Sequence, residues 1–248
     1  MWVEGGEFLM GSSDSDPYAR DNEKPQHRVK LSGFWMSATE VTNAQYDQFL
    51  WVMEAKGGAE WDAVKKSSSH YPDLDDRFKG ANQPVVCVSY DDAQAFCKWV
   101  GHGVTLPTEA QWEYACRAGS TTRFSFGDTL TFEQANILWS PWQEDGRTRA
   151  VGQYEKNAFG LYDMYGNVCE WCSDWYSEDY YQGCKGAGNE DKLEENPKGP
   201  ATGDMRINRG GGWNKGAWTS RSAHREAGEP QSCCYDFLGF RIVAPAAP

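Results

Sequence analysis

The stretch Arg206-Ile-Asn-Arg-Gly-Gly-Gly-Trp213, together with Gly239-Phe-Arg241 further on, decides how this chain is organised. Each motif combines an arginine and a large ring with glycine, which permits tight backbone turns. The segment between the two motifs has no single helical or strand period and mixes aromatic, polar and cysteine residues. Such a segment between two fixed anchors is typical of a recognition surface on a scaffold. The alternative interpretation is an ordinary core hairpin with an aromatic turn.

The composition limits the possible classes of protein. The chain has 248 residues, 40% of them apolar, which is enough for a substantial core. Its net charge of −12 repels phosphate backbones and anionic lipids, so we expect no nucleic-acid partner and no direct membrane contact. No apolar stretch is long enough to span a bilayer, and the amino-terminal residues do not resemble a signal peptide.

The eight cysteines permit disulfides without predicting them. Cys87, Cys97 and Cys116 stand in apolar patterns, which indicates buried thiols. Cys169 and Cys172 form a C-x-x-C motif inside a strand-like run. Redox chemistry is disfavoured there, because a reactive thiolate normally needs a helix N-terminus or a nearby cation.

Three segments carry helix-start signals followed by apolar residues at helical spacing. The signals are Thr42 with Gln45, Ser89 with Asp92, and Thr108 with Gln111. The predicted inner faces are Tyr46, Phe49, Leu50 and Met53; Tyr90, Ala93, Phe96, Cys97 and Val100; and Trp112, Ala115 and Cys116.

Short strand-like runs surround these helices, and no internal repeat is visible. Two long polar stretches, 57–83 and 177–204, are predicted as functional or pinned loops. We therefore predict one α+β domain over residues 1–248. The strand-like runs are Glu7–Met10, Arg28–Met36, Leu161–Met164, Val168–Trp175, Met205–Trp213 and Leu238–Val243.

The ordered motifs resemble the formylglycine-generating-enzyme, or sulfatase-modifying-factor, domain family nearly from end to end. The resemblance implies that family's C-type-lectin-like fold, which has little regular secondary structure. The motifs are Gly6–Gly11, Glu23–Val29, Glu40–Asn43, Pro84–Tyr90, Leu106–Tyr114, Asn157–Asp163, Gly166–Trp171, Arg209–Trp213 and Gly239–Arg241.

The catalytic members of that family use two cysteines, shortly after the glycine-rich motif, to bind copper. Here the matching stretch, Trp213–Arg221, contains no cysteine. Neither Lys215 nor Ser220 supplies the soft thiolate that selects copper. The four histidines, His27, His70, His102 and His224, include no i,i+3 or i,i+4 pair and give no sign of the His-rich domain of the related iron-dependent enzymes. We therefore expect no catalytic residue and no catalytic cofactor, with a copper-dependent oxidase as the alternative function.

The chain is similar instead to the variable proteins of diversity-generating retroelements, and most like the treponemal variable proteins, which are exported lipoproteins. In these proteins adenine-targeted mutagenesis rewrites codons near the C-terminus. Every residue of the run 232–237 is reachable from one Asn codon by changing adenines only. The resemblance implies a variable region at about 206–243, with ligand-binding positions Gly212, Asn214, Ala217, Trp218, Ser220, His224, Glu226, Ser232, Cys233, Tyr235, Asp236 and Phe237.

The same resemblance implies two sites for structural calcium, which prefers oxygen ligands on irregular backbone. The alternative is that these acidic groups are solvated or paired with arginine. The first site comprises Asp163, Gly166, Val168 and Glu170. The second comprises Asn136, Ile137, Asp145 and Arg147.

Several other side chains have a structural interpretation. We expect Arg209, Arg221 and Arg241 to pair with buried carboxylates, because arginine forks lock loops in place. We expect Trp218 to be exposed and Trp213 to be partly buried.

Glu109 and Glu113 have the i,i+4 spacing of an acid/base pair, but a solvated helix face is the preferred interpretation. We expect a monomeric, exported, non-catalytic surface protein that binds a protein or host-surface ligand. A lipid anchor on a leader absent from this chain would be its membrane attachment.

Overall fold

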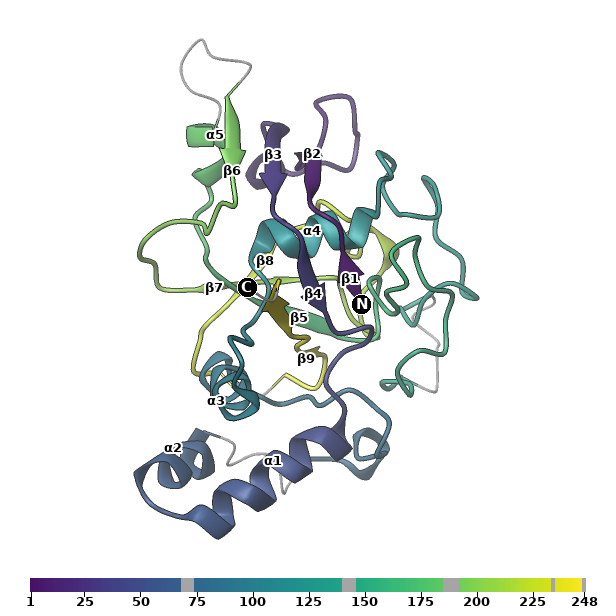
Figure 1. The fold of residues 1–248 in the computed structure, drawn as a ribbon. Helices are drawn as coiled ribbons and strands as arrows, with labels where there is room; N and C mark the ends of the chain where they lie inside the picture. Colours follow the sequence, from purple (N-terminus) through teal and green to yellow (C-terminus); the bar gives the residue numbers. More distant parts are fainter. Residues whose placement is uncertain (68–73, 140–145, 185–191, 233–234, 247–248) are drawn as a thin grey trace.

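The fold is given by a computed structural model that describes residues 1–67, 74–139, 146–184, 192–232 and 235–246. Within these ranges the chain forms three small β-sheets and five α-helices joined by long irregular segments (Figure 1). This arrangement confirms the predicted α+β class with little regular structure.

The three sheets connect distant parts of the sequence. In the first, with order β1-β4-β10, β4 pairs antiparallel with both neighbours. In the second, β2-β3-β6, β6 runs parallel to β3. In the third, β8-β7-β5-β9, β9 runs parallel to β5. The strands are β1 (Trp2–Val3), β2 (Gly6–Met10), β3 (His27–Leu31), β4 (Phe34–Met36), β5 (Cys169–Trp175), β6 (Leu193–Glu195), β7 (Arg206–Arg209), β8 (Glu226–Gly228), β9 (Leu238–Gly239) and β10 (Val243–Pro245).

The three predicted capping boxes are present and begin α1, α3 and α4. Their predicted inner faces are buried, except that Leu50 and Val100 are half-buried. Helices α1, α2 and α3 gather at one end of the molecule, below the sheets in Figure 1. The helices are α1 (Asn43–Lys56), α2 (Ala59–Ser67), α3 (Tyr90–Val100), α4 (Glu109–Arg117) and α5 (Tyr180–Cys184), with 3-10 turns η1 (Asp21–Glu23), η2 (Asp76–Phe78) and η3 (Ala217–Thr219).

Helix α4 contacts β2, β3, β5 and β7, so it is enclosed on more than one side. Glu109 is 2% exposed and Glu113 is fully buried, so the prediction of a solvated face was wrong. Because neighbouring sheets cover this helix, its carboxylates need buried partners, and arginines from distant segments provide them.

Three further predictions need correction. Segment 161–164 is not a strand; the side chain of Asn157 accepts the backbone N–H groups of Phe159 and Leu161 and folds it as a turn. The run 28–36 divides into β3 and β4. The long polar stretches contain α2 and η2 in one case and α5 and β6 in the other, because short polar elements give a weak hydrophobic period.

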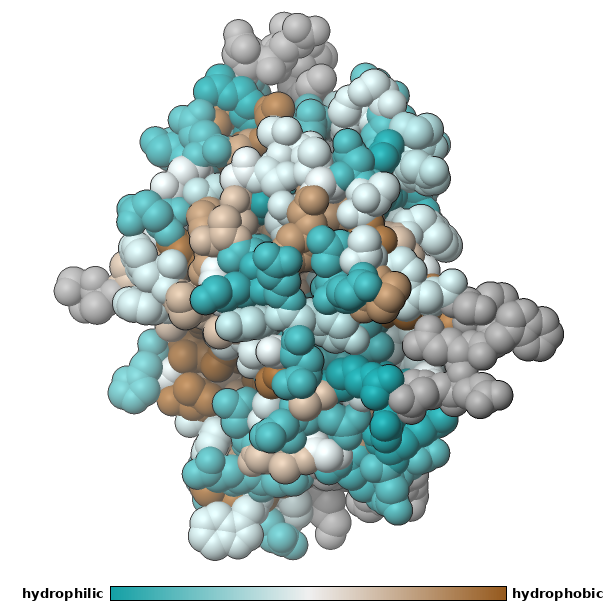
Figure 2. Space-filling view, turned by 90° about the vertical axis from the view of Figure 1, so that its right-hand side faces the viewer, coloured by the Kyte–Doolittle hydropathy of each residue, from teal (hydrophilic) through white to brown (hydrophobic). Residues whose placement is uncertain are grey.

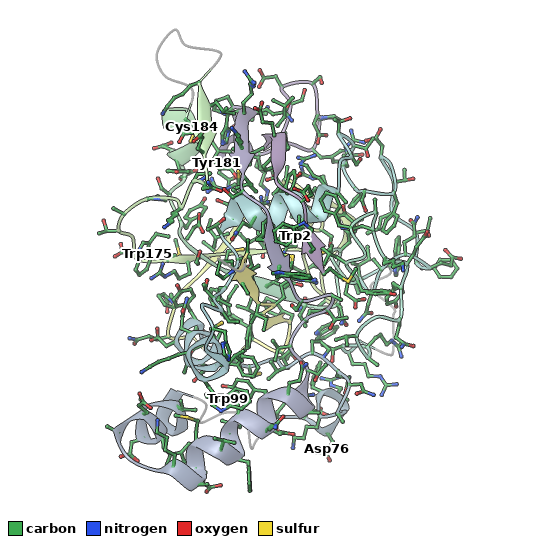
Figure 3. The ribbon with its side chains drawn as sticks, viewed as in Figure 1. Trp2, Asp76, Trp99, Trp175, Tyr181 and Cys184 are labelled. Carbon is green, nitrogen blue, oxygen red and sulfur yellow. The ribbon has the colours of Figure 1, made fainter. Side chains whose placement is uncertain are left out.

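The side chains fill the space between the layers (Figure 3), and the face in Figure 2 is largely hydrophilic with separate apolar patches. Cys87, Cys97 and Cys116 are buried, as predicted. Cys169 and Cys172 are also free and buried on β5, and burial raises the pKa of the Cys169 thiol to about 12. No helix in the described ranges has the length and apolarity required to cross a bilayer.

Candidate functional site

A frame of buried arginines lies beneath the predicted recognition surface. The guanidinium of Arg241 donates to both oxygens of Glu170, at 2.6 and 2.7 Å. Arg221 holds both oxygens of Glu23 in the same way, at 2.8 and 2.7 Å. Together with the Arg209–Glu113 ion pair, these contacts confirm the predicted arginine pairing. Removing one member of such a buried pair typically costs about 3–5 kcal/mol.

Arg225 is a fourth member of this frame, and the sequence analysis missed it. Its guanidinium donates to both oxygens of Glu109, at 2.7 and 2.9 Å. The available signal was the i,i+4 spacing of Glu109 and Glu113 on α4. Which arginines meet them, however, depends on a contact across 116 residues that no local pattern encodes.

The glycine-rich motif after β7 lets the backbone turn tightly at the edge of the frame. Gly210 and Gly211 have φ values of +98° and +72°, which favour glycine. A Cβ on Gly211 would also overlap the hydroxyl of Ser220. The motif therefore fixes the path of the chain into the segment that follows.

The structure brings most of the predicted ligand-binding positions to the surface. Trp218 is 51% exposed and Trp213 is half-buried, as predicted. We call the exposed and half-buried residues of this set the recognition patch. They are Asn214, Ala217, Trp218, Glu226, Ser232, Tyr235, Asp236 and Phe237.

Three of the predicted positions do not belong to this patch. Gly212, Ser220 and His224 are buried, so these positions present no side chain to an external ligand. Ser220 lies against the glycine turn, and a Cβ on Gly212 would lie 3.2 Å from Phe237. Cys233 lies outside the described residues.

His224 is buried because its ring lies between two carboxylates. Its Nδ1 is 3.2 Å from Glu23 and its Nε2 is 3.3 Å from Glu226, while Trp218 packs edge-on at 5.9 Å. Although burial opposes it, hydrogen bonds from His224 and Arg221 lower the pKa of Glu23 to about 2. Hydrogen bonds from His224 and Lys215 likewise lower the pKa of Glu226 to about 2 against the effect of burial. The patch therefore rests on an ionised network.

Lys215 joins the two halves of the patch. Its ammonium pairs with Glu226 and lies 4.9 Å from the ring centre of Phe237. The ring of Phe237 packs against Tyr235 at 5.2 Å. The indole N–H of Trp213 donates to the Asp236 carbonyl at 2.9 Å, so segments 213–218 and 235–237 form one surface.

Residues from the amino-terminal part of the chain extend this surface, and the sequence analysis missed them. The guanidinium of Arg20 lies 4.8 Å from the ring centre of Trp218. Tyr18 is 58% exposed, and Arg123 lies 4.9 Å from its ring centre. No feature of the sequence near residues 18–20 indicated this proximity, because it arises only from the fold.

The two carboxylates of the first expected calcium site have different neighbours. Glu170 is fully used by Arg241 and by the indole N–H of Trp112 at 2.7 Å. Asp163 faces Glu40, a buried glutamate that the sequence analysis missed. One Glu40 oxygen accepts from Asn167, and its other oxygen has no hydrogen-bond partner in the described part of the chain. Burial raises the pKa of both carboxyls, and repulsion from Asp163 raises that of Glu40 further.

The remaining calcium positions lie close to this pair. Gly166 has a φ of +86°. A Cβ at this position would lie only 2.4 Å from the Asn136 carbonyl oxygen, so no residue with a side chain fits there. The Asn136 amide donates to the Arg147 carbonyl at 2.9 Å. Val168 and Ile137 are buried, and Asp145 lies outside the described residues. Among described residues, no three His, Cys, Asp or Glu side chains form a metal-binding group, so a cation here would depend on backbone oxygens as well.

Comparison with known proteins identifies the family. The "Sulfatase-modifying factor enzyme 1-like domain" matches residues 1–246, and the chain belongs to this family. It is 34% identical to the formylglycine-generating enzyme of Streptomyces coelicolor, over 98% of this chain and 88% of that enzyme. It is 32% identical to the mouse (Mus musculus) enzyme of the same name, over 99% and 75% of the two chains.

Solved structures, including the following two, share the fold. PvdO from Pseudomonas aeruginosa superposes with a TM-score of 0.77 at 26% identity, covering 98% of this chain and 93% of that one. Treponema denticola variable protein 1 superposes with a TM-score of 0.74 at 23% identity, covering 98% and 94%. These matches confirm the resemblance and the fold class predicted from the motifs.

Proposed function

We propose that this protein is a non-catalytic ligand-binding member of the family, in which the recognition patch contacts a protein or host-surface ligand. The observation that carries the proposal is a difference in burial between the arginines and the aromatic side chains of the C-terminal segment. Four of its arginines are buried and internally paired, whereas Trp218 is exposed and the half-buried rings of Tyr235 and Phe237 pack against each other. Aromatic side chains with small polar neighbours on a fixed backbone are the chemistry of antibody-like recognition.

Binding is tested with two matched sets of alanine substitutions. One set changes Trp218, Tyr235 and Phe237 in the patch, and the other changes the exposed Trp51, Phe132 and Leu9 elsewhere. Candidate ligands are selected from a displayed protein library on the wild-type chain. We expect the patch set to abolish capture and the control set to retain it; equal capture by both sets contradicts the proposal.

The diversification proposal has its own test at the level of DNA. A near-copy of the last codons, with adenines at the differing positions and a reverse transcriptase gene nearby, would support it. An isolated gene without such a copy would contradict it.

A copper-dependent oxidase is the second candidate, favoured by the identity with formylglycine-generating enzymes. Against it, Lys215 is held by Glu226, and neither Lys215 nor Ser220 offers a thiolate. Copper(I) titration combined with turnover of a cysteine-containing sulfatase peptide separates the two functions. Turnover would defeat the binding proposal.

Three further proposals concern the location, the oligomeric state and a structural ion of this protein. We propose export to the cell surface through a lipid anchor, a monomeric state, and one structural calcium ion near Glu40 and Asp163. Membrane fractionation, light scattering and calcium-dependent melting test them in turn.

A further inference from the structure

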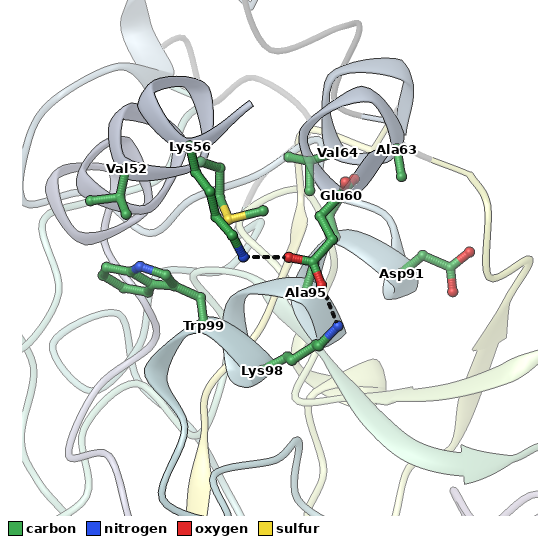
Figure 4. Close-up of a pocket in the computed structure, with 11 residues that line it drawn as sticks. Val52, Lys56, Glu60, Ala63, Val64, Asp91, Ala95, Lys98 and Trp99 are labelled. Carbon is green, nitrogen blue, oxygen red and sulfur yellow. Dashed lines mark hydrogen bonds and ion pairs between the residues drawn. The ribbon is translucent and has the colours of Figure 1, made fainter. Parts of the chain in front are cut away.

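A groove between α1, α2 and α3 is separate from the recognition patch (Figure 4). Its volume is about 480 Å³, within the roughly 300–1,000 Å³ typical of small-molecule sites. The groove combines an apolar floor with charged groups at its edge. The floor is formed by Val52, Met53, Ala63, Val64, Ala95 and Trp99.

Two ammonium groups converge on one carboxylate at the edge of this groove. Lys56 Nζ lies 2.7 Å from one oxygen of Glu60, and Lys98 Nζ lies 2.7 Å from the other. The three residues come from three different helices, as Figure 4 shows. Hydrogen bonds and charge from Lys56 and Lys98 lower the pKa of Glu60 to about 2, so this carboxylate remains ionised.

The helix that carries Glu60 is joined to α1 by two glycines. Gly57 and Gly58 have φ values of +62° and +81°, and a Cβ on either would meet no atom within 4 Å. Glycine is therefore required by backbone conformation and not by close packing. Two adjacent glycines give the α1–α2 connection unusual conformational freedom, so Glu60 can leave the two lysines without disturbing α1.

We propose that this groove binds a small amphipathic carboxylate, such as a medium-chain aliphatic acid. The ligand carboxylate would take the place of Glu60 between Lys56 and Lys98. Its aliphatic tail would lie on the apolar floor, along Met53 and Trp99. Asp91 lies at the lining on α3 and is acidic, which disfavours the reversed orientation.

Octanoate is a suitable probe, with butyrate and octanol as its comparisons. Burial of each methylene strengthens binding by about fourfold, so octanoate should bind at least tenfold more tightly than butyrate. Octanol has the same tail without the charge and should bind at least tenfold more weakly than octanoate. NMR of methyl-labelled methionine locates binding, because we expect the Met53 methyl to shift among the six methionines of the chain.

Three variants separate a ligand site from an ordinary surface ion pair. Lys98→Met should weaken octanoate binding at least fivefold, because it removes one ammonium. Glu60→Gln should strengthen binding several-fold, because it removes the internal competitor. Glu54→Gln, an equal charge change on the exposed part of α1, should leave the affinity unchanged.

Equal binding of octanol and octanoate would overturn the proposal. So would the absence of a saturable Met53 shift, or a loss of affinity in Glu60→Gln like that in Lys98→Met. The Lys98 side chain is 76% exposed and that of Glu60 is 47% exposed, so we expect both variants to fold. Unchanged NMR signals from the methionines far from the groove would confirm that each variant is folded.

Discussion

The clearest pH-dependent prediction concerns Asp174 on β5, which is 3% exposed. Its carboxylate accepts the Glu109 N–H at 2.9 Å and the Ser173 hydroxyl at 3.0 Å. Burial, followed by repulsion from Glu109, raises the pKa of Asp174 to about 7. The unfolded chain has an ordinary aspartate pKa of about 3.9, so the two states take up protons over different pH ranges.

Proton linkage determines the direction in which the free energy of unfolding changes with pH. Below pH ~4 both states hold the proton, and the carboxyl has no effect on stability. As the pH rises from ~4 to ~7, the unfolded state ionises while the folded state does not, so the free energy of unfolding falls. The total loss is roughly 4 kcal/mol, and more than half of it falls between pH 5 and pH 8.

Asp174→Asn removes this loss while retaining an oxygen that accepts both hydrogen bonds. Between pH 5 and pH 8 the wild-type chain should therefore lose roughly 2–3 kcal/mol more stability than the variant. Denaturant unfolding followed by tryptophan fluorescence at both pH values measures the difference. The exposed Asp14 gives the matched control, Asp14→Asn, which should follow the wild type. Parallel pH profiles for wild type and Asp174→Asn would refute the reasoning.

Three shorter predictions follow from the frame and the sites. Arg241→Met should lower the free energy of unfolding by about 3–5 kcal/mol, because it leaves the Glu170 carboxylate without its arginine. Adding Glu170→Gln to this variant should recover part of the loss. If the effects of the two substitutions simply added, the pairing would be contradicted. Gly211→Ala should lower the melting temperature strongly, because it adds a clash to a φ of +72°; a cost below ~1 kcal/mol would be inconsistent. Calcium should raise the melting temperature of the wild type but much less that of Glu40→Gln, and an equal rise in both would argue against that ligand.

The features that the sequence predicted are those encoded locally or in motif order. Thr42 and Gln45 satisfy backbone donors three residues apart, so the start of α1 could be predicted without knowing the fold. The exposure of Trp218 followed from its place in an irregular segment between two anchors. The family motifs added the fold itself, which no periodicity in this loop-rich chain would have indicated.

The features that it missed depend on what lies across the fold. Glu113 has the spacing of a solvated helix face, yet two sheets cover it and Arg209 pairs with it across 96 residues. His224 fits the set of variable residue types, but its neighbours Glu23 and Glu226 bury it. Residue type alone could not distinguish a position proposed to vary from a part of the frame.

The frame is compatible with the proposed variability, because buried arginines can hold a long irregular segment in a fixed shape independently of its surface side chains. Irregular backbone leaves carbonyl groups without ladder partners, and a buried unpaired carbonyl is costly. Arginines provide the missing donors here: Arg209 donates to the carbonyls of Ser222 and His224, and Arg225 donates to that of Asn22. None of these bonds involves a side chain of the recognition patch. Substitution in the patch therefore leaves the backbone hydrogen bonds intact, so we expect changes such as Trp218→Ala to alter ligand binding with an effect on stability within about 0.5 kcal/mol. A larger loss of stability would mean that the patch supports the fold and is not free to vary.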